Sequence, residues 1–214
     1  MKCASKARVL ASAVLFAAGA AFAEGQPYQP APATGYDFTY RRHFGFYIRP
    51  DLGFGYQTSS ESGITISGGA ALIGFAIGGA LSENSILAGH IFGSGVSNPN
   101  VSGGGISGTA NDTSLTMSGI GPQYTYYFMP SNVYLSTTLA LTRMRSSTRN
   151  GDFDSDYGIG TRIALGKEWW VGDHWGLGVV GHVSFSTNQD PDGSGGTNTL
   201  TTWAFGAAFS ATYN

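Results

Sequence analysis

The stretch "YGIGTRIALGKEWWVGDHWGLGVVGHVSF", Tyr157 to Phe185, alternates between two kinds of side chain. Between its bulky positions stand small or charged residues such as Gly160, Arg162 and Glu168. The bulky, mostly apolar positions are Tyr157, Ile159, Thr161, Ile163 and Leu165, then Trp175, Leu177, Val179, Val183 and Phe185. A period of two indicates β-strands with one apolar face. The fold depends on whether that face points inward or outward.

The N-terminus has the order of a secretory signal peptide. Lys2, Lys6 and Arg8 precede an apolar run that ends at Ala21-Phe22-Ala23. That run is shorter than the roughly 20 residues of a membrane-spanning helix. We therefore expect a signal peptide over residues 1–23. Cys3, the only cysteine, lies inside it, so we expect the mature chain to have no disulfide.

The composition favours a membrane barrel. Charged residues make up 11% of the chain, against about 25% in soluble domains. Glycine accounts for 33 of 214 residues, and the net charge is −2, so no basic excess indicates nucleic-acid binding. No segment after residue 23 has the pattern of a transmembrane helix. Because only helices and closed barrels satisfy every backbone group in lipid, an all-β barrel is predicted.

The rest of the chain divides into a leader and a barrel. Residues 24–42 contain three prolines and little periodicity, which predicts a flexible periplasmic leader. Residues 43–214 are predicted to form the barrel, with strands long enough to cross the hydrocarbon. Alternation predicts eight strands, at about 43–57, 68–81, 85–94, 114–128, 133–146, 157–171, 175–188 and 199–213.

The connections between these strands alternate in length. Residues 58–67, 94–113, 146–156 and 188–198 form long connections, and 82–84, 129–132 and 172–174 form short ones. Outer-membrane barrels have short periplasmic turns and longer external loops. This sorting predicts an eight-stranded antiparallel up-and-down transmembrane β-barrel with both ends on the periplasmic side.

Size decides which face lies inside. Eight strands enclose an interior just wide enough for side chains, and a full ring of large apolar residues would overfill it. In an inverted, lipocalin-like soluble barrel, the outer surface would be mostly Gly, Ala and Ser. We therefore predict that the apolar face contacts lipid.

The opposite face then carries charges into the lumen. The predicted cluster consists of Arg49, Asp51, Arg162, Glu168 and His182. A basic residue facing lipid would cost about 2–4 kcal/mol at the bilayer midplane. We expect arginines and carboxylates to pair across the barrel as a plug, with an ion path as the alternative.

Two features leave the strands incompletely defined. If His90 faces inward, Leu87 and Ile91 face lipid, but Ile86 and Phe92 then point into the lumen. Periodicity does not decide the phase of this strand. Pro50 and Pro122 each remove a ladder donor, which predicts a bulge or a shifted boundary.

The chain resembles the small eight-stranded outer-membrane barrels of the opacity-protein and OmpA-transmembrane type. The segment "GFYIRPDLGFGY", residues 45–56, resembles their first strand, and "WAFGAAFSATYN", residues 203–214, their last. Gly206, Phe209 and Tyr213 resemble the signal read by the barrel-assembly machinery, although Asn214 replaces the usual final aromatic residue. The resemblance implies an outer-membrane location among lipid and lipopolysaccharide, with no cofactor.

Three classes of function remain open. The leading one is a structural or surface-interaction role, and the first alternative is transport of small or apolar molecules. "HVS", His182 to Ser184, resembles the H-x-S pair of lipid A deacylases, but alternation turns both residues inward. No glutamate follows Glu168, although that family has one. We therefore expect no catalytic residue.

Acidic residues recur in the last two external connections. They are Asp152, Asp154, Asp156, Asp190 and Asp192. Asp190, Asp192, Ser194 and Asn198 have calcium-loop spacing, but Thr201 stands where a bidentate glutamate is wanted. Divalent-cation binding between these loops is one hypothesis, and a polar, glycine-rich turn is the other.

Overall fold

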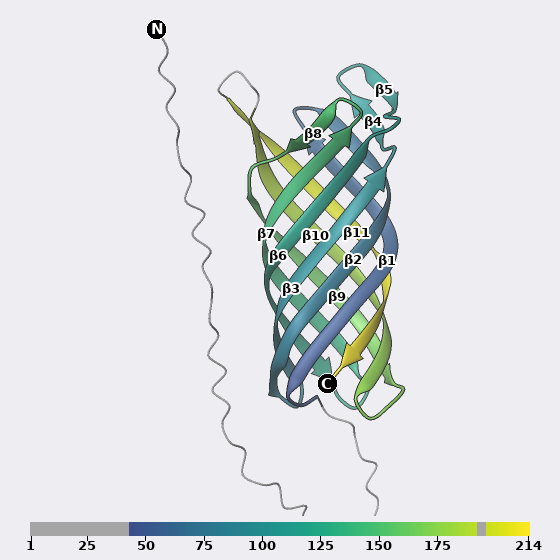
Figure 1. Cartoon of the computed structure of the whole chain (residues 1–214), viewed down its shortest axis with the longest axis vertical. Helices are drawn as coiled ribbons and strands as arrows, with labels where there is room; N and C mark the ends of the chain where they lie inside the picture. Colours follow the sequence, from purple (N-terminus) through teal and green to yellow (C-terminus); the bar gives the residue numbers. More distant parts are fainter. Residues whose placement is uncertain (1–42, 192–195) are drawn as a thin grey trace, which may run out of the picture. The chain divides into compact units, whose positions relative to one another are not determined.

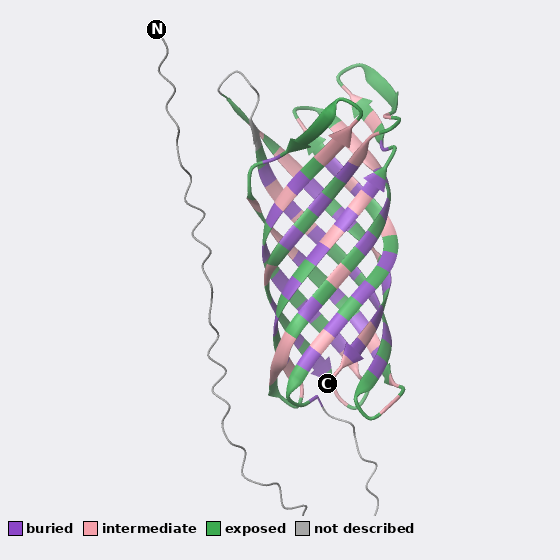
Figure 2. Cartoon of the chain, in the orientation of Figure 1, coloured by how far each residue is buried: buried purple, intermediate pink, exposed green. Residues whose placement is uncertain are grey.

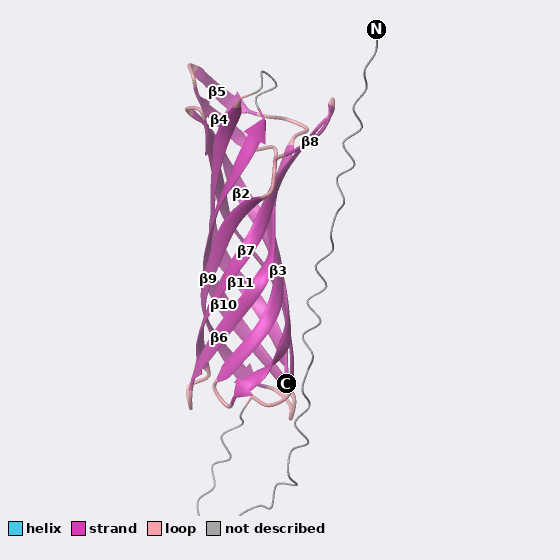
Figure 3. Cartoon of the chain, turned by 90° about the vertical axis from the view of Figure 1, so that its left-hand side faces the viewer, coloured by secondary structure: helices cyan, strands magenta, loops and turns pink. Residues whose placement is uncertain are grey.

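A computed structural model describes residues 43–191 and 196–214, with the side chains of Asp190 and Pro191 excepted. Within this part, eight long strands and three short ones form a single sheet (Figures 1 and 3). The expected signal peptide and leader lie outside the described residues. No helix in the described part is long and apolar enough to cross a membrane.

The long strands follow the predicted segments closely. They are β1 (Phe46–Glu61), β2 (Ile64–Ser82), β3 (Ser85–Ser97), β6 (Ser114–Phe128), β7 (Val133–Thr148), β9 (Gly158–Trp170), β10 (Trp175–Pro191) and β11 (Thr197–Tyr213). Each pairs antiparallel with its neighbours, and β1 pairs with both β2 and β11. This last pairing closes the sheet, so the predicted eight-stranded antiparallel barrel is confirmed.

The register fixes the stagger of the barrel. A path of directly paired residues that starts at Pro50 returns to β1 at Ser60, a displacement of 60 − 50 = 10 residues. The path runs through Phe75, Ile91, Ile120, Leu141, Ile159, Thr187 and Thr201. With strands about 4.8 Å apart and a rise of about 3.3 Å, this stagger tilts the strands by about 40°.

The two faces of the wall differ as predicted. Outward positions such as Leu52, Phe54 and Phe209 are exposed, whereas their chain neighbours are mostly buried in the lumen. Along every long strand, burial alternates with the period of two (Figure 2). The bulky apolar face therefore lies outside, and the prediction is confirmed.

The structure settles the phase of β3. His90 points inward together with Ile86 and Phe92, while Leu87 and Ile91 are exposed. Glycine makes room for the bulky inward ring, because a Cβ at Gly119 would lie 2.6 Å from a ring carbon of Phe92. Alternation alone does not decide this phase, since both faces of β3 carry large apolar residues.

The prediction of a long connection at residues 58–67 is wrong. β1 and β2 continue until Glu61 pairs with Ile64, leaving only Ser62 and Gly63 as the turn. Both have positive φ, 47° and 81°, which the tight turns favoured by twisted hairpins require. The alternating Ile64 and Ile66 extend the strand pattern into the predicted loop.

The bulges expected at the prolines are also absent from the described ladders. Pairing of β1 with β11 is interrupted at Arg49 and Pro50, and that of β6 with β7 at Gly121 and Pro122. The register on either side is unchanged. The missing proline N–H is therefore accommodated by a local gap in one ladder.

Two of the long connections carry short strands beyond the barrel. β4 (Asn100–Gly103) and β5 (Ile106–Thr109) form a hairpin, and β4 also pairs with the external end of β2. β8 (Gly151–Asp154) folds back on β7. The three short turns are at the opposite end of the barrel (Figure 1).

Candidate functional site

Asp51 on β1 and Arg162 on β9 form a buried ion pair inside the barrel. The Arg162 Nη2 atom lies 2.8 Å from Asp51 Oδ1, and the two side chains are 3% and 2% exposed. A Cβ at Gly74 would lie 2.4 Å from an Asp51 oxygen, so glycine is needed beside the carboxylate. This is one arginine–carboxylate pair of the kind expected across the lumen.

Arg49 lies in an aromatic and amide environment. Its guanidinium carbon is 4.7 Å from the ring centre of Tyr134 and 6.0 Å from that of Tyr47. Its Nη2 donates to Gln123 Oε1 at 3.2 Å. Cation–π contacts with Tyr rings stabilise a guanidinium group that is shielded from water. Arg49 therefore joins the network through neutral partners.

Neutral polar groups connect the network across β3, β6 and β7. Gln123 Nε2 lies 3.1 Å from both His90 Nδ1 and Thr138 Oγ1. Thr138 Oγ1 is in turn 2.9 Å from His90 Nδ1. These contacts satisfy polar side chains inside the barrel, because the lipid outside offers no hydrogen bonds.

Glu168 is held by hydroxyl groups. Thr212 donates to its carboxylate at 2.6 Å, and Tyr127 donates at 3.2 Å. The Tyr127 hydroxyl also lies 3.4 Å from that of Tyr47. Among the described residues no ion pair involves Glu168, so the expected pairing with an arginine applies only to Asp51 and Arg162.

His182 and Ser184 both point into the lumen. The Ser184 hydroxyl donates to the Ala204 carbonyl at 3.3 Å. In the described part of the chain, neither ring nitrogen of His182 has a hydrogen-bond partner. The histidine thus does not activate the serine in this arrangement, and both side chains are separated from lipid by the barrel wall.

A buried histidine lies at the end of the lumen that carries the three short turns. His43 is fully buried, and its ring centre lies 3.7 Å from that of Tyr127 and 5.4 Å from that of Trp170. Burial lowers the His43 pKa to about 4, so the ring is uncharged at neutral pH.

Sequence reasoning missed several members of the lumen network. These are His43, Tyr47, Gln123, Tyr127, Tyr134, Thr138 and Thr212, whereas periodicity leaves the direction of His90 open. Those that lie within strands alternate with the exposed apolar residues of the same strand, which is the signal that could have found them.

The acidic external residues pair with arginines. Asp152 pairs with Arg145, and Asp154 lies 3.3 Å from Arg143 and 3.9 Å from Arg145. The hydrogen bond from Arg145 holds the pKa of Asp152 below its usual range. Asp156 is exposed, whereas the Asp190 side chain and Asp192 lie outside the described residues. Where the structure can be described, no three His, Cys, Asp or Glu side chains form a metal cluster.

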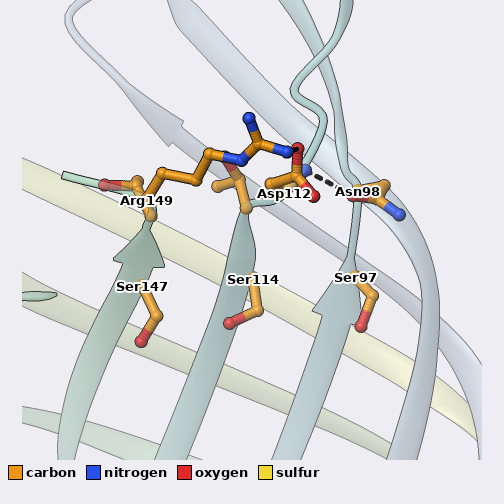
Figure 4. A pocket seen from close by; sticks show the side chains of 8 residues that line it. Ser97, Asn98, Asp112, Ser114, Ser147 and Arg149 are labelled. Atoms are coloured by element: carbon orange, nitrogen blue, oxygen red, sulfur yellow. Dashed lines mark hydrogen bonds and ion pairs between the residues drawn. The ribbon is translucent and has the colours of Figure 1, made fainter. Parts of the chain in front are cut away.

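A shallow groove lined by polar residues lies at the end of β3, β6 and β7 that carries the long connections (Figure 4). Its volume is about 460 Å³, within the range of small-molecule sites. Ser97, Ser114 and Ser147 lie on the three strands, and Asn98, Asp112 and Arg149 lie above them in the loops. Sequence reasoning did not single out this groove, because it depends on three strand ends meeting.

Together these features define a class of protein. A closed eight-stranded antiparallel barrel with an apolar outer wall and a polar, side-chain-filled interior has the fold of small outer-membrane barrels. The outer wall of this chain accordingly suits an outer-membrane location.

Solved structures provide the comparison. The chain is similar to neisserial surface protein A, with a TM-score of 0.51, 17% identity, and 79% of this chain and 96% of the other covered. OprG from Pseudomonas aeruginosa follows at a TM-score of 0.46 and 12% identity, covering 82% and 99%. Ail of Yersinia pestis follows at 0.40 and 9%, covering 78% and 99%. No family model and no curated protein matches the chain.

Proposed function

We propose that this chain is an integral outer-membrane barrel with a structural or surface-interaction role. The observation that carries the proposal is the separation of faces, with Leu52, Phe54 and Phe209 exposed and Arg49, Asp51 and Arg162 buried. Exposed apolar area of this extent requires a covering, and lipid covers the whole circumference of a barrel.

The interior supports an anchoring role. The Asp51–Arg162 pair and the hydroxyl partners of Glu168 fill the lumen with fixed side chains. Networks of side chains whose polar groups are hydrogen-bonded to one another in a low-dielectric interior are rigid. We infer that the lumen is a plug, and that activity resides on the external surface.

The external strands supply the contact surface. Ile106 on β5 is 55% exposed and Phe153 on β8 is 64% exposed. β5 ends the path of paired strands in the sheet, which leaves one row of backbone groups available to a partner. A protein or cell-surface partner at these strands fits the surface role better than a small ligand in the lumen does.

Transport is the second candidate. It is favoured by buried polar atoms without partners in the described part of the lumen, including Nε and Nη1 of Arg49 and both ring nitrogens of His182. Such atoms suit an internal water path. Planar-bilayer recordings separate the two roles, since a plugged barrel gives no discrete conductance steps and a transport barrel gives stable ones.

The proposal also covers the N-terminal segments and the surroundings of the barrel. Residues 1–23 direct export and are removed, 24–42 remain as a periplasmic leader, and the barrel-assembly machinery inserts residues 43–214. Lipid and lipopolysaccharide surround the wall. We propose no enzymatic role, which the inward orientation of His182 and Ser184 supports.

Two matched cysteine variants test the surface role. Ser107→Cys lies on exposed β5 and Ser82→Cys at an exposed periplasmic turn. If Cys3 leaves with the signal peptide, each variant carries one thiol. In intact cells an impermeant maleimide should label Ser107→Cys only, and permeabilised cells should label both. Labelling of Ser82→Cys alone in intact cells would contradict the proposed orientation.

A further inference from the structure

The polar groove at the external rim opens on the outer wall, away from the lumen. Ser97 pairs directly with Ser114, which pairs with Ser147. The adjacent Val96 and Leu115 are buried in the lumen. Since neighbouring positions on a strand point to opposite faces, the three serines face the surroundings of the barrel.

The height of the groove restricts what can reach it. On each strand the last exposed apolar residue below the serine, Ile91, Ile120 or Leu141, stands six residues away. Six residues span about 20 Å, or about 15 Å along the barrel axis at a tilt of about 40°. Phospholipid head groups add only about 5–7 Å beyond the hydrocarbon. The groove thus lies above them.

The chemistry of the groove favours a polyhydroxylated ligand. Arg149 and Asp112 neutralise each other at 2.9 Å. The Asp112 N–H donates to the Asn98 side chain at 2.8 Å, and the Asn98 N–H to the Thr113 carbonyl at the same distance. Hydroxyl, amide and guanidinium groups together offer both donors and acceptors.

Two hydroxyls remain available to a ligand. No hydrogen bond within the described part of the chain uses the side chain of Ser97 or Ser114. The surrounding loops are fixed by the contacts among Asn98, Asp112, Thr113 and Arg149. Because these contacts fix the loops before a ligand arrives, little conformational entropy is lost when the ligand binds.

We propose that this groove binds the sugar head group of an outer-leaflet glycolipid beside the barrel. A glycolipid in the surrounding leaflet presents sugar hydroxyls at this height and from this side. The proposal rests on the proposed outer-membrane location and adds a defined lipid contact to it.

Hydrogen exchange of the full barrel in nanodiscs tests the site. One set of nanodiscs contains phosphatidylethanolamine and phosphatidylglycerol, and a second adds rough-type lipopolysaccharide. A third arm adds deacylated lipopolysaccharide oligosaccharide to the first set. Loop amides at residues 98, 112–113 and 148–150 should exchange at least threefold more slowly with lipopolysaccharide. The free oligosaccharide at the same concentration should leave them unchanged.

Matched variants locate the effect. Ser114→Leu fills the groove and should abolish the slowing, Arg149→Gln should weaken it, and Ser107→Leu on exposed β5 should retain it. A heat-dependent gel shift of each variant confirms that the barrel is folded and inserted, which separates this site from the proposed function.

Three results would overturn the proposal. The first is equal exchange with and without lipopolysaccharide, and the second is slowing that Ser114→Leu does not alter. The third is equal slowing by the free oligosaccharide, which would make the groove a site for a soluble saccharide.

Discussion

At the scale of single residues, alternation identifies the face of a side chain but not its partner. The five predicted lumen charges are all buried, because a period of two assigns their parity. Arg162 pairs with Asp51 rather than Glu168, and this choice depends on the ten-residue stagger and on Gly74. Neither is encoded in local sequence, so the network could not be assembled from pattern alone.

The Asp51–Arg162 pair yields the first prediction. Asp51→Asn or Arg162→Gln alone should lower the free energy of unfolding by about 3–5 kcal/mol, because each leaves a buried charge without its partner. The double variant should lose much less than the sum. Urea unfolding in detergent micelles measures this, with Ser107→Ala as the control. Strict additivity would show that the two side chains do not interact.

At the scale of elements, strand positions were predictable and loop structure was not. Eight apolar alternations mark the eight long strands, but residues 58–67 are predicted as a loop because they are rich in Ser, Gly and Thr. The hairpin of β4 and β5 and the short β8 lack strong alternation. They form because β2 and β7 project beyond the barrel and offer edges for pairing.

The turn at Ser62 and Gly63 gives the second prediction. Gly63→Val places a β-branched side chain at a φ of +81°, which should cost about 1–3 kcal/mol of unfolding free energy. Gly108→Val is the matched control, since a Cβ there meets nothing within 4 Å and no positive φ is involved. Equal stability of the two variants would argue for a flexible loop instead of the tight turn.

The pairing of β7 with β8 gives a pH prediction. Arg145 lowers the pKa of Asp152 from its ordinary 3.8, so this ion pair stabilises the hairpin above about pH 4. Its contribution is lost as pH falls through the lowered value. Hydrogen exchange of the β8 amides, corrected for intrinsic rates, should show weakening protection in acid.

Asp152→Asn is the control for that measurement. It should lower β8 protection at neutral pH and remove the part of the acid response due to this residue. An unchanged acid response in Asp152→Asn would assign the effect to other groups, such as Asp154.

At the scale of the whole molecule, closure of the sheet is the feature that lets a chain with few charged residues fold in a membrane. The pairing of β1 with β11 leaves the barrel without an open edge within the membrane, which lipid requires. Gly119 beside Phe92 shows how the small interior admits a large ring. The sequence predicted this architecture because low charge, alternation and most of the connection lengths agreed. The groove at the rim depends on the register, which the sequence pattern did not supply.

The apolar wall of the closed barrel is expected to face lipid. The most direct measurement is to fractionate expressing cells and to run the outer-membrane fraction on a gel, boiled and unboiled. We expect a band in that fraction whose mobility changes on boiling, because a closed barrel resists detergent until heated. A soluble periplasmic band of fixed mobility would contradict it and would mean that the apolar face lines an internal cavity.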